Sequence, residues 1–148
     1  MYHIVIEQTK DYKKRMKYDP IKNTFYETEF ESLAHVRNFL HPHGWIKESG
    51  TPPKPHLDVI LLSTANYKLG DEVEVKIIGC FMRNDGDSKL IGILPDRLET
   101  DFFELPEIEK ADLQRLYPRL DKGEGWFGAA IAEEIIDVFY AKYKKESK

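Results

Sequence analysis

Alternating and compact apolar runs over the first two thirds of the chain predict β-strands. Residues 2–7, 23–30 and 72–82 alternate between apolar or aromatic and polar positions, whereas residues 57–62 and 89–94 are short apolar runs typical of buried strands. Residues 84–87 have the composition of a tight turn and predict a hairpin between the last two strands. Residues 32–40 indicate a short helix or turn, and the proline-rich residues 49–55 indicate a loop.

The last third of the chain changes to helical spacing. Apolar residues recur at this spacing between Pro106, which suits a first helical turn, and Pro118, which stops the helix; the apolar positions are Ile108, Ala111, Leu113, Leu116 and Tyr117. A second set predicts an amphipathic helix over residues 126–145: Ile131, Ile135, Val138 and Phe139. No internal repeat interrupts the pattern, so we expect a single domain over residues 1–148.

Composition and charge narrow the class of protein. A chain of 148 residues with 41% hydrophobic content can bury one continuous core, and its apolar runs are far shorter than the ~20 residues that span a bilayer. A formal charge of −4 and a pI near 5.8 argue against a broad nucleic-acid-binding face. The first residues lack the pattern of an export signal, and Cys80 has no partner for an internal disulfide. We therefore expect a cytoplasmic protein that binds neither nucleic acid nor membranes.

The densest candidate for chemistry is the predicted hairpin at residues 84–89. It brings two acids, Asp85 and Asp87, close to Lys89. Carboxylates at this spacing can hold a hard cation, and a lysine beside them can neutralise a phosphate. Asp and Gly are also the ordinary residues of hairpin turns, so the same segment can be purely structural.

Two further groups allow both a functional and a structural interpretation. His41 and His43 are spaced to lie on one face of a strand and, with His56, could bind a transition metal, although surface and turn histidines have the same appearance. A basic cluster could line an anion pocket or form a solvated face; its members are Lys10, Lys13, Lys14, Arg15 and Lys17.

Taken in order, these segments resemble the soluble inorganic pyrophosphatases of family I. Val-Ile-Glu at residues 5–7 and Lys-Tyr-Asp-Pro at residues 17–20 are similar to the first two motifs of that family, and His-Pro-His-Gly-Trp-Ile at residues 41–46 is similar to the third. Asp58-Val-Ile keeps the end of the signature Asp-Gly-Asp-Pro-Leu-Asp-Val-Leu, and residues 87–95 resemble Asp-x-Lys-Ile-Ile-Ala-Val-Pro. The similar Leu-Pro, Leu-Tyr and Gly-Trp segments follow at residues 105–106, 116–117 and 125–126.

The resemblance implies an α+β fold dominated by a five-stranded, OB-like β-barrel with flanking helices, including a C-terminal amphipathic helix. It implies a homo-oligomer that uses magnesium to hydrolyse pyrophosphate or a related phosphoanhydride. Carried over by position, the metal ligands are Glu7, Asp58, Asp87 and Asp85, with Asn84 as the alternative to Asp85. The phosphate-binding residues are Arg15, Lys89 and Tyr117, and the catalytic residues are Asp58, Asp87 and Lys89.

The chain departs from the family pattern at several of its functional positions. Pro53 and Pro55 stand where the first two signature acids belong, and Glu29 and Pro118 replace a phosphate-binding arginine and lysine. Three hypotheses follow. The chain is a weakened or altered magnesium-dependent phosphohydrolase, or an inactive pyrophosphatase-like protein that binds a phosphate ligand or a protein partner. Alternatively, its histidines rebuild a transition-metal site.

Overall fold

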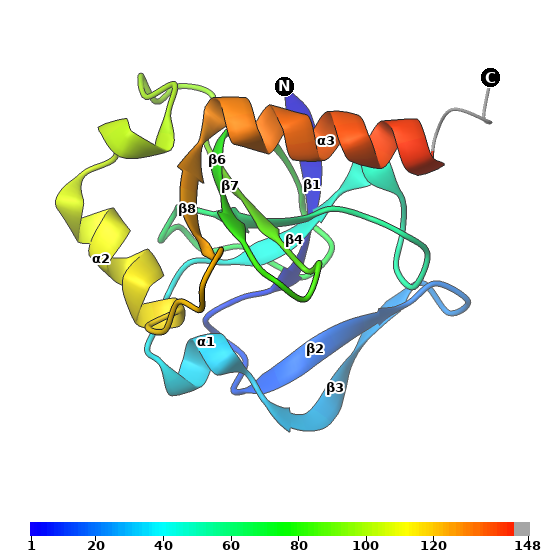
Figure 1. Cartoon of the computed structure of the whole chain (residues 1–148). Helices are drawn as coiled ribbons and strands as arrows, with labels where there is room; N and C mark the ends of the chain where they lie inside the picture. The colour runs from blue at the N-terminus through cyan, green and yellow to red at the C-terminus, as the bar shows by residue number, and fades with distance from the viewer. Residues whose placement is uncertain (144–148) are drawn as a thin grey trace.

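A closed five-stranded barrel forms the centre of the computed structural model, which describes residues 1–143 (Figure 1). The strands follow one another around the barrel in the order β1 (Tyr2–Gln8), β4 (His43–Ile46), β5 (Asp58–Leu61), β7 (Lys89–Ile93) and β6 (Glu72–Met82). The first part of β6 pairs with β1 and closes the ring, while its last part also pairs with β8 (Gly125–Gly128). All neighbours are antiparallel except β5 and β7. The predicted barrel and the β6–β7 hairpin are therefore confirmed, although β4 was not predicted as a strand and the predicted strand at residues 23–30 lies outside the barrel.

Alternation along the strands separates two apolar clusters. Ile4, Ile6, Val59 and Leu61 point into the barrel, where they meet Ala132 and Ile136 of α3 (Ala129–Tyr143). Cys80 belongs to the same cluster, and its burial raises the pKa of the thiol to about 11. In Figure 1, α3 lies across one end of the barrel.

The second cluster lies on the outer surface of β5, β6 and β7. Ile60, Ile78 and Ile91 pack there against Leu113 and Leu116 of α2 (Glu107–Leu116). The 3₁₀ turns η2 (Phe102–Glu104) and η1 (Lys47–Ser49) complete the connections beside the barrel. No helix among residues 1–143 has the length and apolarity needed to cross a membrane.

A separate hairpin stands beside the barrel. It consists of β2 (Lys14–Asp19) and β3 (Thr24–Glu31), and α1 (Leu33–Val36) follows it. The buried amide of Gln8 joins the hairpin to β1: its Nε2 donates to the Lys14 carbonyl at 3.0 Å, and its Oε1 accepts from the Met16 N–H at 2.7 Å. Tyr18 and Phe25 of the hairpin pack against Trp45 of β4.

The structure corrects three details of the predicted elements. Residues 126–128 belong to strand β8, because their backbone pairs with β6, and the final helix begins only at Ala129; the predicted residues 144 and 145 lie outside the described residues. Ile108 and Val138 are 73% and 68% exposed, since the buried faces of α2 and α3 are centred on other positions. His41 lies before β4, so it does not share a strand face with His43.

We predict that Ile136→Ala lowers the free energy of unfolding by about 2–5 kcal/mol, because it leaves a cavity between α3 and the barrel. Val138→Ala is the matched control on the same helix, and its exposed position predicts a change within about 0.5 kcal/mol. Urea unfolding followed by circular dichroism measures both values. Equal losses for the two variants would show that α3 does not pack as described.

Candidate functional site

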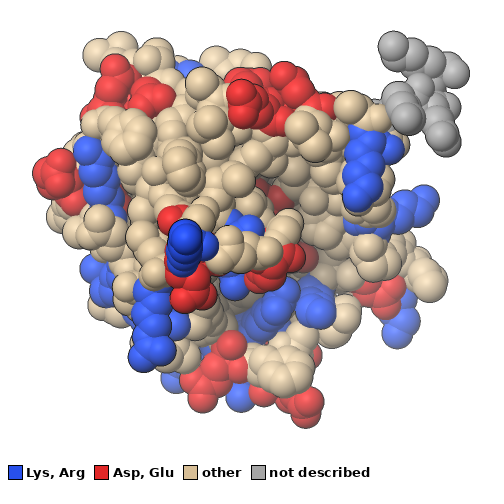
Figure 2. All heavy atoms as spheres, viewed as in Figure 1, with Lys and Arg blue, Asp and Glu red and all other residues tan. Residues whose placement is uncertain are grey.

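A cavity of about 950 Å³ lies between the barrel, the β2–β3 hairpin and the C-terminal end of α2. Six Lys or Arg side chains and four Asp or Glu side chains line it, so its formal charge is positive although the chain is acidic. Figure 2 shows Lys and Arg side chains recessed in a hollow near the middle of this face. A cavity of this size and charge suits an anionic small molecule.

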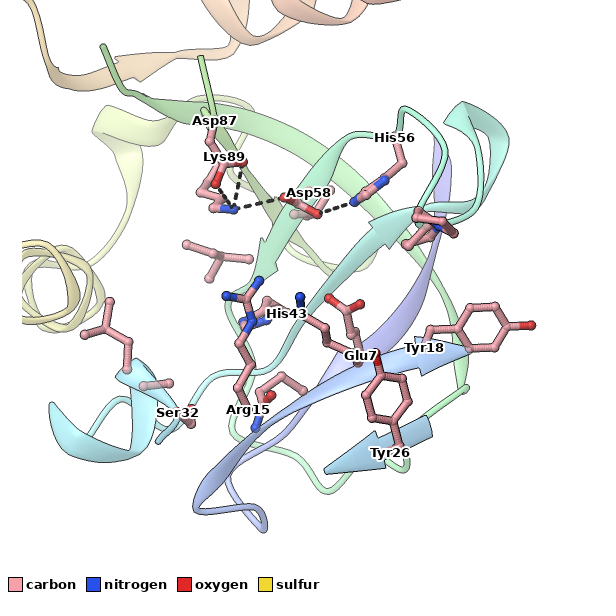
Figure 3. A pocket seen from close by; sticks show the side chains of 18 of the residues that line it. Glu7, Arg15, Tyr18, Tyr26, Ser32, His43, His56, Asp58, Asp87 and Lys89 are labelled. Atoms are coloured by element: carbon pink, nitrogen blue, oxygen red, sulfur yellow. Dashed lines mark hydrogen bonds and ion pairs between the residues drawn. The ribbon is translucent and has the colours of Figure 1, made fainter. Parts of the chain in front are cut away.

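The ammonium group of Lys89 is held between two carboxylates (Figure 3). Its Nζ lies 2.9 Å from Oδ2 of Asp58 and 3.1 Å from each oxygen of Asp87. The parallel register of β5 and β7 places Asp58 opposite Lys89, which explains why the pair forms. Burial alone would lower the pKa of Lys89, but the two carboxylates raise it, so the lysine is charged at neutral pH.

Asp58 has a second partner in His56. Nε2 of His56 lies 3.2 Å from Oδ1 of Asp58, so both carboxylate oxygens are engaged. Burial by itself would raise the pKa of Asp58, but the hydrogen bond from His56 and the charge of Lys89 hold it well below its usual range. The same hydrogen bond raises the pKa of His56. Asp58 is therefore an ionised carboxylate that holds Lys89 on one oxygen and His56 on the other.

Glu7 is the carboxylate of the cavity that has neither a hydrogen-bond nor an ion-pair partner among the side chains drawn in Figure 3. It projects from β1 toward the hollow between Arg15 and Asp58. Burial and the nearby charge of Asp58 raise the pKa of Glu7 to about 7. Near neutral pH its carboxyl group can therefore accept or release a proton.

His43 and Arg15 lie on the same side of the cavity as Glu7. Burial and the positive charges of Lys89 and Arg15 lower the pKa of His43 to about 4, so the imidazole is neutral at physiological pH. Arg15 belongs to strand β2 and carries its charge into the cavity from the hairpin. Arg15, His43 and Lys89 therefore line one shared cavity.

Tyr117 closes the far wall of the cavity. Its ring stacks on Phe81 at 4.5 Å, and the guanidinium of Arg83 lies over the ring at 5.6 Å from its centre. Burial raises the pKa of Tyr117, so its hydroxyl keeps the proton it can donate. Sequence reasoning missed Arg83. The signal available was an arginine between the end of one strand and the acidic turn that leads into the strand beginning at Lys89.

The predicted site residues thus fall into two sets. The cavity brings together Glu7, Arg15, Asp58, Asp87, Lys89 and Tyr117. Asp85 and Asn84 do not line it: Asp85 forms an ion pair with Arg83 at 3.2 Å, and the Asn84 side chain donates to the Lys122 carbonyl at 3.0 Å. Lys10, Lys13 and Lys14 also lie outside the cavity lining, whereas Lys17 lines it.

The three histidines of the alternative metal site do not come together. His41 is buried and its Nε2 contacts Oδ2 of Asp112 at 2.9 Å, away from the cavity that His43 and His56 line. Within residues 1–143, no group of three or more His, Cys, Asp or Glu side chains has an arrangement that could hold a metal ion. The arrangement gives a rebuilt transition-metal site no support.

Comparison with known proteins agrees with the fold and the predicted resemblance. The inorganic pyrophosphatase of Thermus thermophilus is 28% identical over 159 residues, which cover 96% of this chain and 90% of that protein. The crystal structure of an inorganic pyrophosphatase from Neisseria gonorrhoeae superposes with a TM-score of 0.74 at 18% identity, covering 97% of this chain and 91% of the other. For the Thermus thermophilus structure the TM-score is 0.69 at 23% identity, with 96% and 90% covered. This chain is a relative of the soluble inorganic pyrophosphatases and has their fold. No protein-family model matches it.

The carboxylates of the cavity do not fit the multi-ion magnesium centre that the resemblance implies. Pro53 lines the cavity where that resemblance expects an acid, and a proline side chain offers no ligand oxygen. Lys89 engages both oxygens of Asp87 and one of Asp58, and His56 engages the other. Three carboxylates beside Lys89 and Arg15 carry too little net negative charge to concentrate several divalent cations.

The raised pKa of Glu7 predicts a pH-dependent stability. Because the folded state holds this proton more tightly than the unfolded state, Glu7 favours folding below about pH 4.5, and this contribution is lost as the pH rises through about 7. The loss is on the order of 3 kcal/mol. Chemical denaturation of the wild type and of Glu7→Gln in EDTA, between pH 4.5 and 8, measures it as the difference between the two proteins. A constant difference would contradict the assigned pKa.

Proposed function

We propose that this chain binds pyrophosphate or a related phosphoanhydride in the cavity and hydrolyses it weakly. The observation that supports this proposal best is the placement of Lys89 and Arg15 in one positively charged cavity of a pyrophosphatase fold. The names of the sequence relative and of the structural neighbours support the same reaction class.

Binding depends on the cations that face the cavity. Lys89 is charged and partly buried, so its hydrogen bonds to phosphate oxygens form in an environment with little competing water. Arg15 offers a guanidinium fork that matches phosphate geometry, and the Tyr117 hydroxyl can donate a further hydrogen bond. Asp58 and Asp87 hold Lys89 in place but repel the incoming anion, which limits affinity.

Hydrolysis requires water to add to one phosphorus while the bond from that phosphorus to the bridging oxygen breaks. Glu7 is suited to accept the proton of this water, because its carboxylate has no partner in the cavity and its pKa is near 7. Lys89 and Arg15 would stabilise the negative charge that develops on the phosphate oxygens. No step of this reaction depends on a metal centre, so we expect a rate of pyrophosphate hydrolysis that is low for a protein with this fold.

A second candidate is binding without turnover. Its specific support is the engagement of both Asp58 oxygens, together with Pro53 and Pro55 at positions where the resemblance expects acids. A protein of this kind would hold the phosphate ligand without activating water. The cytoplasmic location and the homo-oligomer stay predictions from the sequence.

We predict that Lys89→Gln weakens pyrophosphate binding about tenfold to hundredfold, because it removes a charge-assisted hydrogen bond. Lys47→Gln is the matched control, since Lys47 is exposed, pairs with Glu72 and lies outside the cavity lining. Isothermal titration calorimetry measures both affinities. Equal affinities for the two variants would exclude Lys89 from the binding site.

We predict that Glu7→Gln lowers kcat for phosphate release by roughly 10²–10⁴-fold and leaves pyrophosphate affinity within about threefold, since only the proton acceptor is lost. Phosphate release is measured with magnesium, manganese, zinc or EDTA. Absence of release in every condition, with pyrophosphate still bound, would favour the binding protein over the hydrolase. Absence of both release and binding would contradict the two candidates together.

A further inference from the structure

A second hollow continues the cavity beyond Tyr117. It has a volume of about 430 Å³ and lies between the C-terminal end of α2 and the last residues of β6. Arg37, Arg83 and Tyr117 line both hollows, so the two are parts of one groove, and Arg119 is added at the outer end. The anion site proposed above is therefore the inner end of a longer path.

The cations of this groove follow one another in order. Arg15 and Lys89 line the inner hollow, and Arg119 lines the outer hollow. Arg83 lines both hollows, and its guanidinium lies over the Tyr117 ring at 5.6 Å from the ring centre. Positive charge thus extends from the hairpin across the cavity to the loop after α2.

Most of these cations have no internal partner of opposite charge. Arg15, Arg37 and Arg119 have no carboxylate oxygen within 4 Å among the residues that the structure describes, although the chain as a whole carries an excess of acids. Arg37 donates from Nη1 to the Leu116 carbonyl, which fixes its side chain at the junction of the two hollows. An external polyanion would supply the charge that these side chains lack.

Two acids, Asp121 and Glu124, line the second hollow beside its three arginines. Glu124 accepts hydrogen bonds from the backbone N–H groups of Asn84 at 3.0 Å and Asp121 at 3.1 Å, so its carboxylate serves the loop structure. Arg119 is exposed at the rim, where a ligand can reach it from solvent. The hydrogen bonds of Glu124 therefore fix the loop that forms the outer hollow, and Arg119 is the accessible arginine at its rim.

A pyrophosphate contains two phosphates and can contact Lys89 and Arg15 without reaching the outer arginines. We propose that the groove binds a linear chain of three or more phosphates, with one end at Lys89 and Arg15 and the following phosphates along Arg83, Arg37 and Arg119. This proposal rests on the proposed function, because it assigns that site a longer substrate. The shared chemistry is a linear triphosphate, which both inorganic tripolyphosphate and ATP contain.

Titration calorimetry of the full chain in EDTA, with pyrophosphate, tripolyphosphate and ATP, tests this assignment. We expect tripolyphosphate to bind about tenfold more tightly than pyrophosphate, because one further charge-assisted contact forms. Arg119→Gln should remove most of this preference and leave pyrophosphate affinity unchanged, while Arg119→Lys should keep part of it. If tripolyphosphate binds more tightly than ATP, the ligand is an inorganic phosphate chain. If ATP binds more tightly, the ligand is a nucleotide.

Equal affinity for pyrophosphate and tripolyphosphate would overturn the proposal, as would an Arg119→Gln variant that weakens both ligands to the same extent. Either result would leave the proposed function intact, because pyrophosphate would still bind. Loss of pyrophosphate binding in the wild type would instead refute the proposed function itself. Circular dichroism of Arg119→Gln separates a binding effect from unfolding, and the exposed position of Arg119 makes unfolding an unexpected result.

Discussion

The backbone pairing between β1 and the first half of β6 is the constraint on which the rest of the molecule depends. It joins the two ends of a five-stranded sheet and so leaves neither of them as an open edge. Because β6 is long, its second half pairs with β7 and β8 at the same time. One strand therefore closes the barrel, pairs with the strand that begins at Lys89, and positions β8, which leads directly into α3.

Closure also explains why charged groups from distant parts of the sequence share one cavity. Glu7 lies near the end of β1, while Asp58 and Lys89 begin two parallel strands on the adjoining wall. Asp58 and Lys89 lie on paired strands, and β4 alone separates β5 from β1, so the curvature of the closed sheet turns Glu7 toward the same hollow. Their mutual influence on pKa follows from this convergence and from the exclusion of water around them.

Local pattern was sufficient for much of the fold. Alternation and short apolar runs identified β1, β3, β5, β6 and β7 but not β2 or β4, and the order of short motifs selected Glu7, Asp58 and Lys89, which the structure brings to one cavity. The strand at residues 125–128 was missed, because its Gly-rich sequence runs directly into helical spacing and only the edge of β6 makes it extended. Arg37, Arg83 and Arg119 were missed for a related reason: they lie far apart in sequence, and only the junction of α1, β6 and the loop after α2 makes them neighbours.

The side-chain amide of Gln8 attaches the β2–β3 hairpin to the barrel. The hairpin forms a sheet separate from the barrel, and the Gln8 amide supplies hydrogen bonds that link it to β1. Arg15 and Lys17 belong to this hairpin, whereas Lys89 lies in β7 of the barrel and Arg83 follows β6. The basic side chains that line the cavity therefore come from two separate sheets. The Gln8 hydrogen bonds and the packing of Tyr18 and Phe25 on Trp45 therefore set the span between the opposing cations, and hence the length of anion that the cavity can hold between them.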